Sequence, residues 1–363
     1  MKAKKSEILT IALFCGFLVV MAVLYLILPK AEFSQLEKRY LASMPKADFE
    51  DIASGEWGGD VESYLADHIP FRDFFVGLNA YFDLYTGRQA GKDIQILGDS
   101  LVEAPVEMDT SAAQRKMSVI NTFAEIVGQK VDLAIIPSAG WAYESRSGAY
   151  SDEAIIQNIY AMAGENVHPV DMLSVFKEQP QLYYRTDHHW TSEGAFEAYK
   201  AYVTENDREY REKADFKVEI VEDFRGSTYS RSALWLTPGE NLEMWHGSEN
   251  LTVVNAETEG IHEGVFYREQ LEEADKYTVF LGGNHSLVRI QNPEKNGKIL
   301  VIRDSYANCL GAFLAESYGE VVLVDLRYYT SPVSELAAEG FDQILVAYSI
   351  GNFMTDTNIP RLR

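Results

Sequence analysis

The residues best able to form a catalytic centre lie in the stretch 185–191, which reads Arg-Thr-Asp-His-His-Trp-Thr and holds the only adjacent histidines in the sequence. Asp187 and His189 are two positions apart, so in an extended turn their side chains lie on the same side. An ionised carboxylate in that place accepts the proton on one imidazole nitrogen and fixes the tautomer, which leaves the other nitrogen free to act as a base. The pattern therefore predicts an Asp187/His189 pair that activates a nucleophile.

The nucleophile for this base is predicted at the end of an apolar segment. Residues 298–303 read as a buried strand that breaks into an Asp-Ser-Tyr turn. Small residues follow the serine, as where a helix begins close behind a nucleophile. The resulting prediction is a site assembled from Ser305, His189 and Asp187.

The same stretch has a second interpretation as a metal site made of Asp187, His188 and His189. Metal sites usually draw their ligands at helical or hairpin spacing, and the sequence has no HxxxH or CxxC pattern. We therefore predict no metal and no cofactor, and expect His188 and Trp190 to pack around the site or shape it.

The elements that must position these residues follow an α/β pattern. Buried strands alternate with helices, which predicts a mostly parallel, doubly wound sheet, and such sheets bind ligands beyond the carboxyl ends of their strands. The turn at Ser305 falls at that edge. Strands are expected at 131–136, 278–281, 298–303, 321–324 and 344–347, and helices at 112–127, 192–203 and 334–339. Short strands separated by turns predict a β-rich insertion at about 216–277.

Composition limits the possible partners. The net charge of −23 leaves no basic surface for nucleic acid, so nucleic acid is not expected as a partner. The two cysteines are Cys15, in an apolar leader, and Cys309, just after Ser305. We therefore expect stability to come from the core rather than from disulfides.

The N-terminus predicts a membrane anchor. Residues 8–28 are uncharged and long enough to span a lipid bilayer, and Lys2, Lys4 and Lys5 precede them. The lysines are expected in the cytoplasm and the rest of the chain outside it. We therefore predict an anchor at 1–29, a stalk at 30–60 and an extracytoplasmic α/β domain at 61–363, tethered to the cell membrane by a single span.

The Asp-His-His-Trp stretch, followed by the strand and Asp304-Ser305-Tyr306-Ala307, resembles the motifs of the DHHW family of SGNH-hydrolase-like proteins, which are relatives of the alginate O-acetylation proteins. Weaker motifs in the same order extend the resemblance from the stalk to the C-terminus: Asp67-x-x-x-Phe71-Arg72, Gly226 with Tyr229-Ser230, Leu281-Gly282-Gly283-Asn284, and Asp325-Leu326-Arg327-Tyr328-Tyr329.

The resemblance implies an SGNH-hydrolase-like α/β fold whose motifs occur in permuted order. It implies Ser305 as nucleophile, His189 as base and Asp187 as orienting acid. It also implies transfer of acetyl groups onto an extracytoplasmic polysaccharide, alongside a polytopic membrane-bound O-acyltransferase that supplies them.

The chain departs from the SGNH pattern at the oxyanion hole. SGNH enzymes usually place an asparagine after a central strand, whereas the strand at 131–136 runs into Pro-Ser-Ala-Gly. Three asparagines are candidates for the missing donor: Asn308, Asn284 and Asn352. Arg327 and Tyr348, at the ends of late strands, are predicted to bind the acetyl donor or the sugar.

Ser100 is the rival nucleophile, because it belongs to a literal Gly-Asp-Ser-Leu sequence after a predicted strand at 94–97. In a conventional GDSL enzyme the serine comes early and the Asp/His pair comes last, near the C-terminus. Here the pair lies in the middle of the chain and a second strand-Asp-Ser turn follows it. That order favours Ser305 over Ser100.

Three functions fit these motifs. The prediction is an O-acetyltransferase with an acetyl-serine intermediate, in which His189 activates the sugar hydroxyl that takes the acetyl group. If water replaces the sugar, the same chemistry is that of a carbohydrate acetylesterase, and the difference lies in acceptor binding and water exclusion. A non-catalytic polysaccharide-binding scaffold is the third function, although an intact Ser/His/Asp set argues against it.

Overall fold

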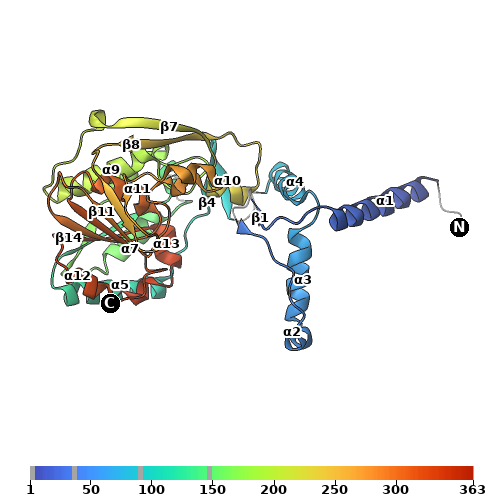
Figure 1. Cartoon of the computed structure of the whole chain (residues 1–363), viewed down its shortest axis with the longest axis horizontal. Coiled ribbons are helices and arrows are strands. Elements are labelled where there is room, and N and C mark those ends of the chain that lie inside the picture. The colour runs from blue at the N-terminus through green and yellow to red at the C-terminus, as the bar shows by residue number, and fades with distance from the viewer. Residues whose placement is uncertain (1–4, 35–38, 89–92, 145–148, 363) are drawn as a thin grey trace. The chain divides into compact units, whose positions relative to one another are not determined.

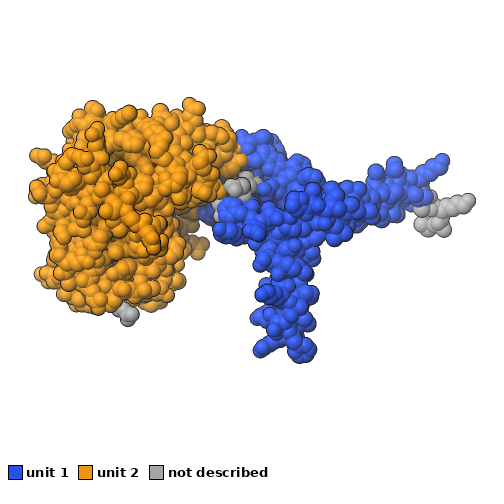
Figure 2. All heavy atoms as spheres, in the orientation of Figure 1, with its two compact units in different colours: residues 1–91, 230–236 blue, residues 92–229, 237–363 orange. Residues whose placement is uncertain are grey.

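The computed structural model of the chain describes residues 5–34, 39–88, 93–144 and 149–362. The chain divides into two compact units, one of residues 1–91 with 230–236 and one of residues 92–229 with 237–363 (Figure 2). The predicted catalytic residues all lie in the second unit.

The first unit is built mainly from helices. They are α1 (Lys5–Ile27), α2 (Phe49–Ser54), α3 (Glu56–Asp67) and α4 (Arg72–Tyr85), accompanied by the short antiparallel strands β1 (Phe33–Ser34) and β2 (Arg39–Tyr40). The described part of α1 is long and apolar enough to cross a membrane, and none of its side chains is buried.

A sharp turn separates α3 from α4. Pro70 lacks the N–H that would continue a helix, and Phe71 has a φ of 60°, which ends α3 and reorients the chain. Asp67 binds the guanidinium of Arg39 and the backbone N–H of Ala42, at 2.5 and 2.9 Å. The hydrogen bond from Arg39 holds the pKa of Asp67 well below its usual range.

The second unit contains an eight-stranded sheet with the order β10-β9-β11-β13-β12-β14-β5-β6 (Figure 1). Strands β13, β12, β14, β5 and β6 are parallel, and β11, β9 and β10 form an antiparallel extension at one side. The bounds are β5 (Val131–Ile136), β6 (Val167–Val170), β9 (Thr252–Asn255), β10 (His262–Glu263), β11 (Leu287–Gln291), β12 (Lys298–Arg303), β13 (Glu320–Val324) and β14 (Gln343–Ser349). The predicted mixed α/β fold with a mostly parallel sheet is confirmed.

Helices cover both faces of this sheet. Alternate residues of β12 belong to different cores: Ile299 and Val301 pack with one cluster of buried side chains, and Leu300 and Ile302 with another. The first cluster includes side chains of α9 (Ser192–Glu205) and α11 (Tyr306–Leu314), and the second includes side chains of α5 (Thr110–Val127) and α7 (Asp152–Tyr160). Burial on both faces explains why the central strands read as unbroken apolar runs.

One predicted strand is wrong. The first half of 278–281 lies in the 3-10 helix η4 (Lys276–Val279) and the second half forms no strand, whereas the strand of that region is β11, which the apolar pattern did not indicate. A short apolar run is buried equally well in a strand or in a tight helical turn, so its composition cannot distinguish them. β11 carries Arg289 and Gln291 at positions that are not fully buried, so it lacks the continuous apolar pattern that predicts a buried strand.

The segment predicted as an insertion contains two different structures. β7 (Lys217–Phe224) and β8 (Glu240–His246) form a two-stranded sheet of their own, whereas β9 and β10 extend the central sheet. The remaining elements are β3 (Ile94–Leu97), β4 (Ser100–Glu103), α6 (Ala139–Glu144), α8 (Leu173–Phe176), η1 (Pro180–Leu182), η2 (Lys213–Asp215), α10 (Ser227–Ser232), η3 (Arg268–Glu272), α12 (Val333–Ala337), α13 (Ile350–Thr355) and η5 (Ile359–Arg361).

Candidate active site

Ser305 lies just beyond the carboxyl end of β12, at the residue that precedes α11. The side chain of Asp304 fixes this turn. It accepts hydrogen bonds from the backbone N–H of Tyr306, from the N–H and hydroxyl of Ser349, and from the amide of Asn352, all at 2.8–3.0 Å. Asp304 is thus a structural residue that ties the end of β12 to the end of β14.

The Asp-His-His-Trp stretch reaches Ser305 from the loop before α9. His189 Nδ1 lies 2.5 Å from Asp187 Oδ1, and His189 Nε2 lies 2.8 Å from Ser305 Oγ. With Nδ1 donating to the carboxylate, Nε2 is the nitrogen that accepts the serine proton. The structure therefore brings the three predicted side chains into one hydrogen-bonded row. That they catalyse a reaction stays a prediction.

The environment of Asp187 keeps its carboxylate ionised. Burial by itself would raise the pKa of Asp187, but the charges of His189 and His188 and the hydrogen bonds from His189 and Ser227 outweigh it and hold the pKa well below its usual range. The backbone N–H groups of His189 and Ser227 donate to Asp187 at 2.9 and 2.6 Å. An ionised, firmly held Asp187 is suited to fix the tautomer of His189 and to stabilise its protonated form.

Three residues that support the row were not predicted as site residues: Tyr277 and Glu240 gave no signal in the sequence, and Gly226 stood only in a weak family motif. The ring of Tyr277 stacks on His189, with centroids 3.8 Å apart and planes 5° from parallel. Gly226 lies so close to Asp187 that an added Cβ would be 2.2 Å from the carboxylate. Glu240 of β8 accepts the backbone N–H groups of Arg185 and Thr186, at 2.9 and 2.7 Å, and burial raises its pKa. All three come from segments far from the Asp187 stretch in sequence.

His188 and Trp190 shape the site, as predicted. His188 Nδ1 lies 2.5 Å from Ser227 Oγ, and burial lowers the pKa of its imidazole, which favours the neutral form. The indole N–H of Trp190 donates to the carbonyl of Tyr306 at 3.1 Å, and the hydroxyl of Tyr306 donates to the carbonyl of His188. These bonds join the loop before α9 directly to the first turn of α11.

The rival Ser100 lies elsewhere. It starts β4, in the β3–β4 hairpin, and its hydroxyl is 2.6 Å from that of Tyr143. Its neighbour Asp99 pairs with Arg185 at 2.9 Å. His189 Nε2 is bonded to Ser305 and not to Ser100, so the geometry favours Ser305.

The three asparagines that are candidate oxyanion donors differ in the hydrogen bonds that their side chains make. The amide of Asn352 donates to Asp304 at 2.8 Å, and the amide of Asn308 donates to Asn284 Oδ1 at 3.1 Å. Asn284 Oδ1 also accepts from the buried Arg303, at 3.0 Å. Asn284 itself is exposed, and these two bonds turn its oxygen inward, so its own amide nitrogen faces away from them.

Arg327 and Tyr348 occupy contrasting positions. Arg327 pairs through two nitrogens with Asp325, and it lines a cavity of about 280 Å³ together with Asp304 and Asn352. Tyr348 is only 1% exposed and packs in the core cluster that includes α5. Arg327 is therefore placed to meet a ligand beside the Ser305 turn, whereas Tyr348 has almost no surface to offer one. The predicted binding roles stay predictions.

The ligand atoms of Asp187, His188 and His189 lie within 4.8 Å of one another, the spacing of a possible metal site. Each of them is engaged, since Asp187 bonds His189, His189 bonds Ser305, and His188 bonds Ser227. A metal ion could bind these atoms only if the three hydrogen bonds were broken. The donor set thus suits acid–base chemistry better than metal binding.

A family model described as DHHW protein matches residues 85–324. The chain belongs to the DHHW family. The predicted resemblance is thereby confirmed.

Two solved structures share the fold, and a third is similar to a smaller degree. A DHHW family protein from Eubacterium siraeum has a TM-score of 0.65 and 22% identity, covering 74% of this chain and 93% of that one. Bacillus cereus PatB1, solved with a sulfonyl adduct, has a TM-score of 0.63 and 18% identity, covering 74% and 98%. The O-acetyltransferase domain of Pseudomonas putida AlgJ gives a TM-score of 0.41 and 14% identity, covering 72% and 92%. No curated protein matches the sequence.

Proposed function

We propose that this DHHW protein is an O-acetyltransferase that carries the acetyl group on Ser305 and passes it to a hydroxyl of a cell-surface or exported polysaccharide. The observation that carries the proposal is the row Asp187–His189–Ser305, with contacts of 2.5 and 2.8 Å at the carboxyl edge of a parallel sheet. A serine hydroxyl bonded to an imidazole that is itself held by a carboxylate is the arrangement that activates serine as a nucleophile.

In the first half-reaction, His189 Nε2 takes the proton of Ser305 while Oγ attacks the carbonyl carbon of the acetyl donor. The bond between that carbon and the donor oxygen breaks, and the leaving oxygen takes the proton from His189. In the second half-reaction, a sugar hydroxyl gives its proton to His189 and attacks the acetyl-serine. The acetyl group moves to the sugar, and Ser305 regains its proton from His189. Asp187 stays ionised throughout and stabilises the protonated imidazole.

The oxyanion of each tetrahedral intermediate needs hydrogen-bond donors. The first N–H groups of α11 are engaged: those of Tyr306 and Ala307 bond Asp304, and that of Asn308 bonds the carbonyl of Ser305. The side-chain amides of Asn308 and Asn352 each donate one hydrogen bond, to Asn284 and to Asp304, whereas among the described residues none is found from the amide nitrogen of Asn284. We therefore assign the side-chain donor to the outward amide nitrogen of Asn284.

The location and partners belong to the same proposal. α1 would anchor the chain in the cell membrane with its N-terminal lysines in the cytoplasm, so that the α/β domain works outside it. The family resemblance suggests that a membrane-bound O-acyltransferase supplies the acetyl group. The cavity beside Arg327, Asp304 and Asn352 offers a polar wall to a sugar or to the donor.

The test uses the full-length chain in detergent with a chromogenic acetyl ester, read by intact mass. We expect wild type and Ser100→Ala to gain one acetyl group, and Ser305→Ala to gain none. Because the PatB1 structure of this fold carries a sulfonyl adduct, a sulfonyl fluoride is a second probe, and we expect it to modify Ser305 here. An adduct that is lost only in Ser100→Ala would contradict the assignment of the nucleophile.

A second measurement separates the transferase from an esterase. Added oligosaccharide should receive the acetyl group and speed the decay of acetyl-serine in the wild type. Release of free acetate at a rate that oligosaccharide does not change would instead indicate a carbohydrate acetylesterase. If neither reagent modifies any form of the protein, the polysaccharide-binding scaffold becomes the better explanation.

A further inference from the structure

One face of α4 carries an apolar stripe that the fold leaves uncovered. Its side chains recur every three or four positions and are half exposed or more: Phe71 61%, Phe74 54%, Leu78 50%, Phe82 62% and Tyr85 85%. The other side of the same helix is the packed one, where Gly77 and Ala80 are buried. A Cβ on Gly77 would lie 1.9 Å from the ring of Trp235, so this close approach requires glycine. Trp235 also stacks on Phe74, at the edge of the stripe, with ring centroids 5.7 Å apart, whereas Leu78, Phe82 and Tyr85 are left facing outward.

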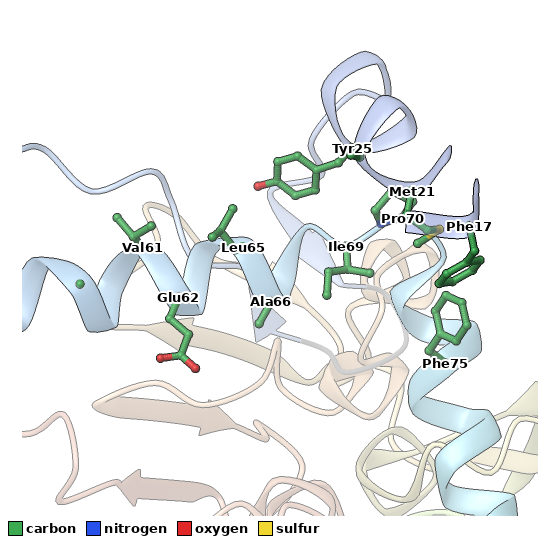
Figure 3. Close-up of a pocket in the computed structure, with 12 residues that line it drawn as sticks. Phe17, Met21, Tyr25, Val61, Glu62, Leu65, Ala66, Ile69, Pro70 and Phe75 are labelled. Atoms are coloured by element: carbon green, nitrogen blue, oxygen red, sulfur yellow. The ribbon is translucent and has the colours of Figure 1, made fainter. Parts of the chain in front are cut away.

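A second apolar surface lies between α1 and the helices that follow it. A cavity of about 820 Å³ is lined by Phe17 and Met21 of α1, by Val61 and Leu65 of α3, and by Phe75 of α4 (Figure 3). The charged side chain among its lining residues, Glu62, points away from Val61 and Leu65 in this view. Besides Glu62, the hydroxyl of Tyr25 is the polar side-chain group among the lining residues, which is few polar partners for water, and a protein in water rarely exposes so large an apolar surface.

The position of this cavity along α1 indicates how deep α3 and α4 would lie in a bilayer that α1 spans. At about 1.5 Å per residue, Met21 lies about 9 Å along the helix from Ile27, the last residue of α1. The apolar faces of helices that lie on a bilayer enter it by about 5–10 Å. α3 also runs across the direction of α1 (Figure 1), as a helix in the membrane plane does beside a helix that spans it. Side chains of α3 and α4 that share a cavity with Met21 are therefore at the depth of the outer lipid leaflet.

We infer that α3 and α4 lie in the outer leaflet of the bilayer and that lipid acyl chains cover the α4 stripe and fill the cavity beside α1. This inference rests on the proposed placement of α1 in the membrane. Lipid is the occupant because the cavity adjoins α1, whose described side chains are all unburied, and because α4 supplies Phe75 to the cavity and the stripe to its outer face, so the lipid that surrounds α1 can continue onto α4. Three helices rather than one would then hold the chain to the membrane.

The test places an environment-sensitive fluorophore on single cysteines of the full-length chain in vesicles whose lipids carry nitroxide quenchers on their acyl chains. The probe positions are Leu78→Cys and Phe82→Cys on the stripe, each in a Cys15→Ser background. Asp73→Cys is the matched control, because it is exposed on the same helix but about 140° around it from Leu78. A label on the native Cys15 reports α1, and the buried Cys309 does not react.

We expect labels on Leu78→Cys and Phe82→Cys to lose emission about as fully as the label on Cys15, and the label on Asp73→Cys to keep most of it. If Cys15 is quenched but both stripe labels behave like Asp73→Cys, the inference is overturned while the anchor stands. If the label on Cys15 keeps its emission, the proposed anchor fails and this inference fails with it. The acetyl adduct on Ser305 is measured independently of either result.

Discussion

Gly226→Ala should disable the active site without removing any reacting group. An added Cβ would lie 2.2 Å from both Cβ and Oδ2 of Asp187, whereas ordinary van der Waals contact begins at 3.4 Å. The new methyl group and Asp187 must therefore separate by about 1.2 Å. Either movement disturbs the site, because a shift of Asp187 breaks its 2.5 Å contact with His189 and a shift of Gly226 displaces the adjacent N–H of Ser227, which donates to Asp187.

The expected magnitude follows from that displacement. A misplacement of about 1 Å in a catalytic group costs about 10²-fold in rate. Overpacking a filled interior by one methyl group typically costs about 1–3 kcal/mol in the free energy of unfolding. We therefore expect kcat/KM for a chromogenic acetyl ester to fall about 100-fold, with a modest loss of stability measured by urea unfolding.

Gly247→Ala is the matched control. A Cβ there would lie 2.3 Å from Glu316 Oε1, a clash of the same severity at a residue that bonds Arg211 and Ser248 and takes no part in the row. It should lose stability to a similar extent and keep its activity per folded molecule. If Gly226→Ala folds and retains the kcat/KM of the wild type, the contact between Asp187 and His189 does not matter for catalysis and the reasoning is refuted.

Four further predictions concern the same unit. Asp187→Asn should lower kcat by about 10⁴-fold, because an amide favours the wrong tautomer of His189. Asn284→Ala should lower kcat by about 10²–10³-fold if the Asn284 amide stabilises the oxyanion. Steady-state kinetics checks both variants. The pKa of Asp187 is lower in the folded protein than the ordinary aspartate pKa of 3.8, so the ionised carboxylate stabilises the fold above about pH 5. This stabilisation is lost as the pH falls through 3.8 towards the pKa of the folded state. Urea unfolding from about pH 7 to about pH 3 should show a steeper loss for the wild type than for Asp187→Asn. Burial raises the pKa of the Cys309 thiol, so iodoacetamide should leave Cys309 unmodified in the native protein and modify it once urea unfolds the chain, as peptide mass mapping would show.

Much of the fold could be predicted because buried elements have a recognisable pattern of apolar residues. The strands expected at 131–136, 298–303, 321–324 and 344–347 are β5, β12, β13 and β14, since a strand covered on both faces must be apolar at every position. The strand expected at 278–281 was wrong and β11 was missed, because a buried 3-10 turn and a half-exposed antiparallel strand do not leave distinct patterns.

The sequence by itself determined the Asp187/His189 pair, because two residues separated by one position in an extended turn meet whatever the rest of the chain does. It also determined the turn at Ser305, because the polar pair Asp304-Ser305 and the small residues after it end the apolar strand pattern, although the structure keeps the turn and α11 buried. Both are local consequences of backbone geometry and burial.

Only the tertiary structure decided which serine meets His189. Ser100 and Ser305 both follow short strands, but the packing of α9 and α11 on one face of the sheet brings Ser305, 116 positions away, within 2.8 Å of the imidazole. Gly226, Tyr277 and Glu240 reach the site in the same way, from segments that sequence spacing cannot relate to it. Such contacts depend on how separate elements pack into one core. The packing energy of that core comes from side chains throughout the domain, so no single stretch of sequence predicts it.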